Sequence, residues 1–417
     1  MRKAFPKTGT EWQALDAEMT AMSGADINWR QGTAPLYVFH GSDAAYEVGF
    51  QAFMKYFSEN ALGGRRAFFG LKRMEDEVVE MGLDLFRAPD GAVGNMTTGG
   101  SESIFIAVKA ARDWARTQPR LKAPYSIVAP FTAHAAFNKA GDVMDLEVRR
   151  LATGENRRAD VAAMEAAVDD GTIMLVGSAP CFPHGVIDPI QALSDLARER
   201  DIWLHVDACV GGYVAPFFQR IGRDIPDFDM ALPGVRSLSA DLHKFGFCPK
   251  PASTLFYREE EDRERGLFHF DQWPNGQFST ATLSSTRAGG AVTAAWAVMH
   301  HLGEAGYMDI SKQMADMTDA YVAGIKAIDG LHLLAEPDLT IINFGAQDRN
   351  NELDIFKVAE GMDRRGWLPG LTQNPKGMHA MLSMFHEAGR EDYLADLAAS
   401  VEEAKGMGGD PDLKAVY

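Results

Sequence analysis

Apolar residues recur along this chain with two different periods, which predict alternating helices and strands. Met74, Val78, Met81 and Leu85 share the spacing of one helix face. Five short segments are almost continuously apolar, at 126–130, 172–179, 202–208, 237–241 and 253–258. Helical patterns separate the first three strands, near residue 134, at 161–170 and at 190–200. Continuous apolar strands separated by helices are typical of a mostly parallel sheet that is covered on both faces. We therefore predict an α/β fold.

The pattern also predicts how the chain divides. Residues 1–65 form an irregular N-terminal arm with one helix, in which Pro35 and Gly41 interrupt regular structure. We expect a large cofactor-binding domain at 66–310 and a small α+β domain at 311–417, with strands at 339–345 and 379–385 between two helices. A long helix starting near residue 288 leads from one domain to the other, and the boundary falls within 300–325.

Length, charge and cysteine content narrow the possible functions. A chain of 417 residues exceeds the ~250–300 residues that one core supports. The excess of 58 acidic over 41 basic residues gives a charge of −17, which argues against nucleic acid or an anionic membrane as partner. The uncharged stretch 288–303 is too short to span a bilayer, and the N-terminus has no apolar run. The three cysteines suggest no disulfide framework, so we expect a cytoplasmic protein.

The segment TTGGSES (97–103) precedes an apolar helical run and could bind a phosphate. Glycines and serines at the start of a helix offer backbone N–H groups, hydroxyls and the positive end of the helix dipole. The alternative is a serine N-cap, with Glu102 supporting the first turn. The segment lacks the P-loop pattern, which argues against a nucleoside triphosphatase.

Two further candidates follow predicted strands. Asp207 ends the strand 202–208, and ligands in open α/β sheets bind at that end of the strands. Asp207 could instead form a structural salt bridge, or a metal pair with His205, although no third ligand follows at a useful spacing. Lys244 follows the strand 237–241 in apolar surroundings, where a lysine can form a Schiff base; it could also extend from a loop to solvent.

Together these groups match the needs of pyridoxal phosphate. The phosphate-binding segment would hold its phosphate, Asp207 would pair with its protonated ring nitrogen, and Lys244 would bind its aldehyde. His134, in TAHAAFNKA, could lie flat over the ring.

From about residue 34 onward the chain resembles the group II decarboxylase family of fold-type-I pyridoxal-phosphate enzymes, and most closely the sphingosine-phosphate lyases. The matching segments are MTTGGSES, TAHAAFNKA, HVDACVGGY, SLSADLHKFGFCPK, STRAGGAVTAAWAVMHHLGEAGY and RGWLPGLTQNPKGMHAMLSMFH, of which the last two are more typical of the lyases. The resemblance implies an aspartate-aminotransferase-like fold and a homodimer with its active site at the interface.

The resemblance also implies roles for individual residues. The cofactor-binding residues would be Gly100, Ser101, His134, Asp207, His243, Lys244 and Thr286. Lys244, His134, His243 and Tyr37 would be catalytic, with Tyr37 as an acid/base helper. Tyr37, Lys250 and Arg287 would contact the substrate, with Lys250 binding its phosphate.

Departures from the family pattern fall on substrate-facing positions. Gly63 stands where the lyases have a histidine, and Ser284-Ser285-Thr286 replaces a run of small residues. Because the last two matching segments are typical of the lyases, we expect a carbon–carbon lyase that cleaves the Cα–Cβ bond of a β-hydroxy amine or amino-acid-like substrate to release an aldehyde. The departures lead us to expect that this substrate is small and water-soluble. Decarboxylation of an L-amino acid is the alternative. A serine hydrolase built on Ser101, Asp207 and His243 lacks the second glycine of the nucleophile elbow and leaves Lys244 unexplained. A non-catalytic binding protein is a further alternative, which a purified protein that is colourless and unreactive to hydride would favour.

Overall fold

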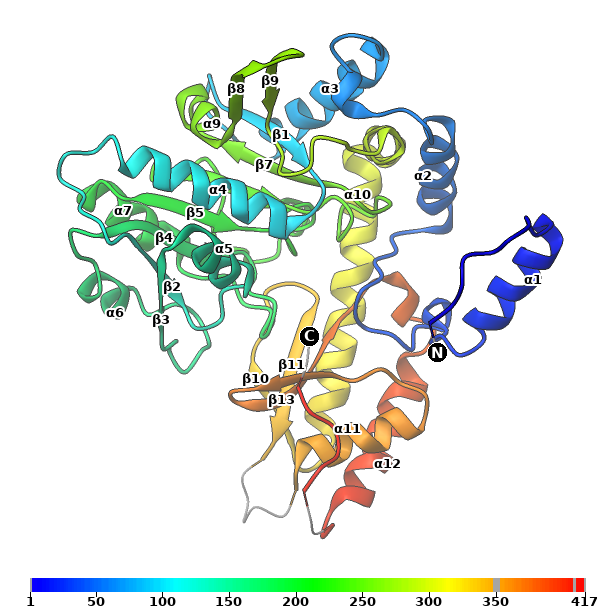
Figure 1. Ribbon diagram of the computed structural model, residues 1–417. Helices are drawn as coiled ribbons and strands as arrows, with labels where there is room; N and C mark the ends of the chain where they lie inside the picture. Colours follow the sequence, from blue (N-terminus) through cyan, green and yellow to red (C-terminus); the bar gives the residue numbers. More distant parts are fainter. Residues whose placement is uncertain (1, 348–352, 408–409, 416–417) are drawn as a thin grey trace.

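The computed structural model describes residues 2–347, 353–407 and 410–415, and a seven-stranded sheet lies at its centre (Figure 1). The strand order is β1 (Val93–Thr97), β7 (Ser253–Tyr257), β6 (Val235–Ala240), β5 (Trp203–Asp207), β4 (Thr172–Ser178), β2 (Ser126–Pro130) and β3 (Glu147–Leu151). The strands from β6 to β3 are parallel to one another, whereas β7 is antiparallel to both β6 and β1. The prediction of a mostly parallel sheet is therefore confirmed.

Helices cover both faces of this sheet, which explains why its inner strands β2 and β4 are buried at every position. On β4, Met174 and Val176 belong to one buried cluster and Leu175 to another. Because alternate residues of a strand face opposite sides, each cluster fills one face. The first cluster includes α4 (Gly100–Ala115) and α5 (Ala136–Met144). The second includes α3 (Phe69–Leu85), α6 (Val161–Ala166), α7 (Ile190–Arg200) and α8 (Ala215–Arg220).

A long helix joins the sheet to a smaller C-terminal part. This helix, α10 (Gly289–Ala327), is interrupted at Gly303, where φ is 53°. Beyond it lies an antiparallel sheet in the order β10 (Leu331–Ala335), β11 (Ile341–Ala346), β13 (Lys376–Met381) and β12 (Gly370–Gln373). The helices α11 (Ile355–Arg364) and α12 (Arg390–Ala404) complete it. The small α+β part is confirmed. Its expected boundary at residues 310 and 311 falls inside α10, so we retain the division into 66–310 and 311–417 as a proposal.

One predicted strand of the small part is shorter than expected. The segment 379–385 leaves the sheet after Met381, and η3 (Met384–His386) follows. His386 and Ser383 cap this turn reciprocally, because the Ser383 N–H donates to His386 Nδ1 at 2.9 Å. Capping groups of this kind compete with the strand and end it.

The prediction of one helix in the N-terminal arm is wrong. The arm contains α1 (Trp12–Ser23) and α2 (Asp43–Lys55), with short helical turns at η1 (Trp29–Gln31) and η2 (Ala61–Gly63). The Ser42 hydroxyl caps α2 by accepting from the Ala45 N–H at 3.2 Å, and α2 packs against α10. No residue of α1 is buried, and the helix stands apart from the rest of the chain (Figure 1).

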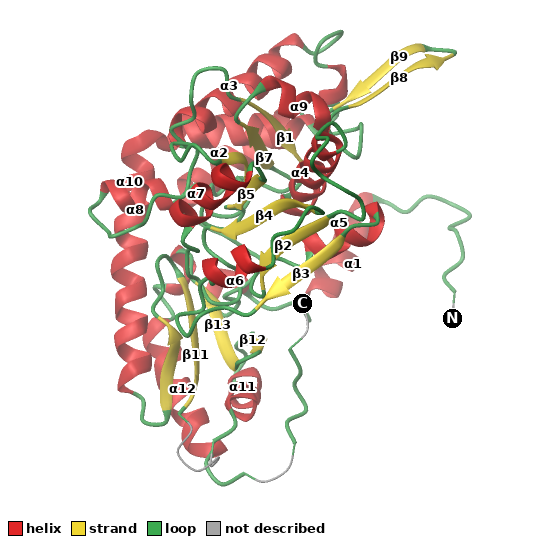
Figure 2. Cartoon of the chain, turned by 90° about the vertical axis from the view of Figure 1, so that its left-hand side faces the viewer, coloured by secondary structure: helices red, strands yellow, loops and turns green. Residues whose placement is uncertain are grey.

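A two-stranded hairpin, β8 (Phe268–Trp273) and β9 (Gly276–Thr280), projects from the large sheet beyond α9 (Glu260–Gly266), as Figure 2 shows. The hairpin was not predicted from the sequence, because it has no buried face that would give an alternating apolar pattern. Within the described ranges, no helix combines the length and apolar character that crossing a bilayer requires.

Candidate active site

The turn between β1 and α4 has the geometry of an anion-binding helix start. Gly99 is the N-cap, so the alternative of a serine N-cap is not what the structure shows. Ser101 lies exposed in the first turn. A Cβ atom on Gly100 would lie 2.6 Å from Cys209 Sγ, so only glycine allows the helix to begin this close to the end of β5.

Glu102 connects this turn to a distant segment of the chain, a role that its position in the motif did not reveal. One carboxylate oxygen accepts from the Thr98 N–H at 2.7 Å and from the Thr98 hydroxyl at 2.8 Å. The other accepts from the N–H groups of Leu283 and Ser284, at 2.9 and 3.3 Å. Glu102 is only 8% exposed. It therefore fixes the turn before α4 and the segment before α10 relative to each other.

Asp207 lies at the carboxyl end of β5, almost fully buried. Its Oδ1 accepts from the Cys209 N–H at 3.1 Å. His205 lies two residues earlier on the same face of β5. Its ring contacts two hydroxyls, Ser237 Oγ at 2.8 Å and Ser239 Oγ at 3.2 Å. Burial lowers the pKa of His205 to about 4, so this imidazole is neutral and engaged within the core. No group of three potential metal-binding side chains occurs in the described part of the chain.

Lys244 forms an ion pair with a carboxylate that we did not select from the sequence, Asp241. The two groups are 3.0 Å apart, from Lys244 Nζ to Asp241 Oδ2. Burial opposes the charged amine, but the surrounding negative groups, of which the Asp241 carboxylate contributes most, together outweigh burial and raise the pKa of Lys244. His243 Nε2 lies 3.6 Å from the same oxygen, and its Nδ1 accepts from the Ala252 N–H at 3.1 Å. Lys244 is therefore a charged amine on a half-buried side chain, paired with a buried carboxylate.

His134 lies just before α5 and within the electrostatic range of both Asp207 and Lys244. Its Nδ1 accepts from the Ala136 N–H at 3.1 Å. Burial lowers the pKa of His134, so the ring is neutral at physiological pH. The structure thus gathers Gly100, Asp207 and Lys244 with this imidazole at one edge of the sheet.

Lys250 and Tyr37 are joined to each other at the border of this group. Lys250 Nζ donates to the Tyr37 carbonyl oxygen at 2.9 Å. Burial, followed by the charge of Lys244, lowers the pKa of Lys250. Tyr37 has a φ of 68°, and its side chain is about half exposed.

The structure places Thr286 and Arg287 beside the N-terminal arm and α3. Asn60 Nδ2 donates to Thr286 Oγ1 at 3.3 Å. The Arg287 guanidinium forms an ion pair with Glu75 of α3. Arg287 is thus already paired within the chain, which was not apparent from its place in the motif.

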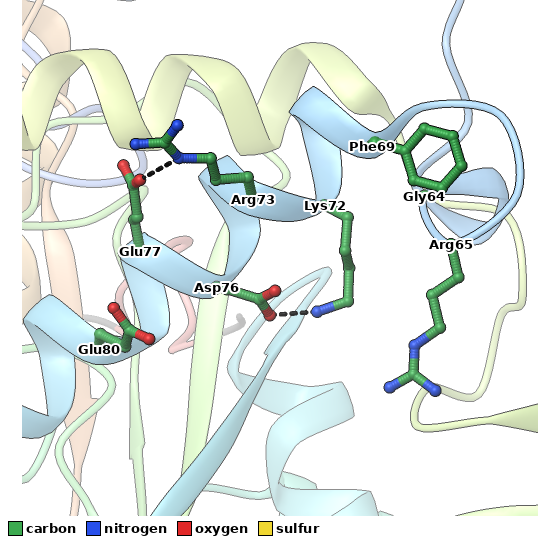
Figure 3. A pocket seen from close by; sticks show the side chains of 8 residues that line it. All are labelled: Gly64, Arg65, Phe69, Lys72, Arg73, Asp76, Glu77 and Glu80. Atoms are coloured by element: carbon green, nitrogen blue, oxygen red, sulfur yellow. Dashed lines mark hydrogen bonds and ion pairs between the residues drawn. The ribbon is translucent and has the colours of Figure 1, made fainter.

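A surface pocket lies away from this group, along α3 and the turn before it (Figure 3). Charged side chains line it and pair with one another, Lys72 with Asp76 and Arg73 with Glu77. Self-paired charges on one helix face leave little to bind a ligand. We therefore do not assign the activity to this pocket.

The gathered residues fit pyridoxal phosphate on an independent observation. Ser178 is 2% exposed, and its hydroxyl has no hydrogen-bond partner among the described residues. Ser178 is in register with Asp207 on the neighbouring parallel strand, so both side chains face the same side of the sheet. A buried hydroxyl without a partner is uncommon and is typical of a place where a ligand or water binds.

Comparisons with known proteins show the family to which the chain is related. Residues 71–347 match the pyridoxal-dependent decarboxylase conserved domain. The sphingosine-1-phosphate lyase of Oryza sativa subsp. japonica is 35% identical over 97% of this chain and 75% of its own length. A probable L-aspartate decarboxylase of Thermococcus gammatolerans is 32% identical over 96% of this chain and 99% of its own. The sphingosine-1-phosphate lyase structure from Burkholderia pseudomallei superposes with a TM-score of 0.91 at 33% identity, covering 97% of this chain and 93% of that one.

Proposed function

The chain belongs to the pyridoxal-dependent decarboxylase family and is a pyridoxal-phosphate-dependent carbon–carbon lyase related to the sphingosine-1-phosphate lyases; we propose that it cleaves the Cα–Cβ bond of a small, water-soluble β-hydroxy amine that carries an anionic group. The observation that carries the site assignment is the amine of Lys244, which pairs with Asp241 beside the start of α4 and is within electrostatic range of Asp207.

Each gathered residue has a task in this reaction. Bound pyridoxal phosphate supplies an electron sink for the bond that breaks at Cα. Lys244 would hold its aldehyde, and Asp207 would keep the proton on its ring nitrogen. Gly100 and Ser101 would bind its phosphate at the start of α4, where backbone N–H groups and the helix dipole favour an anion. The neutral ring of His134 can lie against the cofactor without adding charge.

Proton transfer at the substrate falls to two candidates. Lys244 can act as a general acid or base when it is not covalently engaged. Tyr37 is the second candidate; its side chain is about half exposed, and its carbonyl oxygen accepts from Lys250. The Lys250 ammonium suits a phosphate or carboxylate on the substrate. We retain His243 and Thr286 as cofactor contacts and Arg287 as a substrate contact, the latter on condition that its pair with Glu75 opens.

Two features support a small polar substrate. A Cβ atom on Gly63 would approach the Phe68 ring to within 3.1 Å, so a histidine like that of the lyases would require the ring to shift. Ser284 and Thr286 are exposed and present hydroxyls. Hydroxyls that face an alkyl chain lose hydrogen bonds with water, which disfavours a long-chain lipid.

The test compares turnover of a long-chain sphingoid phosphate with that of short phosphorylated or carboxylated β-hydroxy amines, with aldehyde and carbon dioxide both measured. Faster cleavage of a short substrate with release of aldehyde is expected. Faster cleavage of the lipid would refute the substrate assignment. Release of carbon dioxide without aldehyde from L-aspartate or another amino acid would identify a decarboxylase.

The chain also has a surface suited to a second copy of itself, and we propose a homodimer. Trp12, Met19 and Met22 of α1 are at least half exposed, as are Phe50 and Met54 of α2. Monomers rarely expose so many large apolar side chains on adjacent elements. Sedimentation of the purified protein should give a mass twice that of the chain, and a stable monomer would refute the proposal. Because all three cysteines are free and buried, we also propose the reducing cytoplasm as its location.

A further inference from the structure

The buried carboxylate of Asp241 contacts the amine of Lys244. It is 2% exposed and lies directly after β6. Its Oδ2 lies 3.0 Å from Lys244 Nζ and 3.6 Å from His243 Nε2. Its Oδ1 accepts from the Ser253 hydroxyl at 2.6 Å. Both oxygens lie where a Cβ atom on Gly100 would be only 3.1 Å away. Asp241 is thus fixed under the start of α4.

A buried carboxylate is costly unless it is paired and hydrogen-bonded, and here both conditions are met. Ser253 orients one oxygen, which leaves the other aimed at the amine. The imidazole of His243 competes only weakly with the amine, since its Nε2 lies farther from the carboxylate oxygen, at 3.6 Å, and burial lowers its pKa. Among the carboxylates near Lys244, Asp241 is the one in direct contact, whereas Asp207 acts on it more weakly.

We propose that Asp241 is a positioning residue of the lyase reaction: whenever the Lys244 amine is not covalently engaged, Asp241 holds it as an ammonium group beside the phosphate-binding turn, where it is a proton donor. The proposal rests on the role of Lys244 in the proposed function. Its consequence is that the released lysine neither swings away nor acts as a base until the proton has left it.

The other groups that face this amine do not produce the same effect. Lys250 and His134 lie within electrostatic range, but a cation disfavours the ammonium form and a neutral ring does not stabilise it. Cys209, beside Gly100, has its pKa raised by burial and stays a neutral thiol. Asp207 shares the negative charge but raises the pKa of Lys244 less than Asp241 does, and it is still present in Asp241→Asn.

The test measures the protonation of Lys244 in the cofactor-free full-length chain, by pulse labelling with acetic anhydride at pH 8 to 9 and peptide mass spectrometry. Only the neutral amine reacts. Asp241→Asn should raise the labelling rate of Lys244 by about tenfold or more, because removal of an opposite charge at this distance lowers a pKa by about one unit or more. Lys122, which is exposed, serves as the internal standard whose rate should not change.

A matched control separates charge from packing. Asp262→Asn removes another buried carboxylate, which lies on α9 and pairs with Arg236. This variant should leave the labelling rate of Lys244 unchanged. An unchanged Lys244 rate in Asp241→Asn, or an equal increase in Asp262→Asn, would overturn the proposal. Ser253→Ala keeps the charge and removes its hydrogen bond, so we expect a smaller increase. If Asp241→Asn does not fold, Ser253→Ala decides instead. An unchanged labelling rate of Lys244 in Ser253→Ala would then overturn the proposal.

The loaded enzyme gives a second readout. If the Lys244 ammonium donates a proton, the alkaline limb of turnover against pH should move down by about one unit in Asp241→Asn. A limb that does not move would overturn the role of Asp241 in the reaction. Absence of cofactor from Lys244 after borohydride reduction would instead refute the proposed function, so the two failures are distinguishable.

Discussion

Replacing Glu102 tests how the structure holds the turn before α4, which we propose binds the cofactor phosphate. Its carboxylate accepts four hydrogen bonds, two from Thr98 and one each from the N–H groups of Leu283 and Ser284. Glu102→Ala removes all four. Glu102→Gln keeps one carbonyl oxygen and turns an amide N–H₂ toward N–H donors on the other side, so about half of the connection is lost.

The expected magnitude follows from these contacts. A hydrogen bond to a charged group contributes about 1.5–3 kcal/mol, and such contributions are not additive within one carboxylate. Leu283 and Ser284 are exposed, so water can replace part of what they lose. We expect Glu102→Ala to reduce the free energy that stabilises the ordered turn by about 2–4 kcal/mol. If cofactor binding needs the ordered turn, the cofactor dissociation constant rises by roughly 30-fold to several hundred-fold.

The assay is a titration of the cofactor-free protein with pyridoxal phosphate and, separately, with pyridoxal, which lacks the phosphate. The variant should lose affinity for pyridoxal phosphate and keep its weak affinity for pyridoxal. Asp113→Asn is the matched control on the same helix, because its ion pairs with Lys109, Arg112 and Arg116 are partly exposed and contribute little. An equal loss for both ligands would show that Glu102 only stabilises the fold.

Three further predictions follow from the site and the core. Borohydride reduction and peptide mapping should place the pyridoxyl group on Lys244; an adduct elsewhere would remove that assignment. Asp207→Asn should keep the cofactor but lower turnover by roughly 10- to 100-fold, the equivalent of ~1.5–3 kcal/mol, and near-normal turnover would mean that Asp207 is structural. Burial lowers the pKa of His205 and of His379 to about 4, so unfolded chains take up protons that folded chains do not. Stability against urea should therefore be complete above about pH 6.5 and fall as the pH drops toward 4, by up to about 1.4 kcal/mol per pH unit for each histidine; His379→Asn should flatten this dependence, and an unaltered pH profile would contradict it.

The large sheet could be predicted from sequence because its apolar pattern has a single physical cause. A strand covered on both faces must be apolar throughout, and β2, at 126–130, begins and ends at the predicted residues. The helix at 190–200 was equally clear, since one face packs on β4 and β5 while charged residues line the other. The hairpin β8–β9 and α1 lack a buried face within the chain, so periodicity gave no signal for them.

The site shows the same division between local and long-range information. Gly100, Asp207 and Lys244 could be selected because each stands at the end of a predicted strand or the start of a helix, where ligands of α/β sheets bind. Asp241 and Glu102 lay inside the same motifs but were missed, because their functions depend on partners that are distant in sequence. The only available signal was an acidic residue directly after an apolar strand, which also describes many surface residues. A buried carboxylate needs a partner, and here the partner of Asp241 is the lysine on which the chemistry depends. The proposed labelling experiment therefore tests the contact between Asp241 and Lys244, which sequence patterns did not predict.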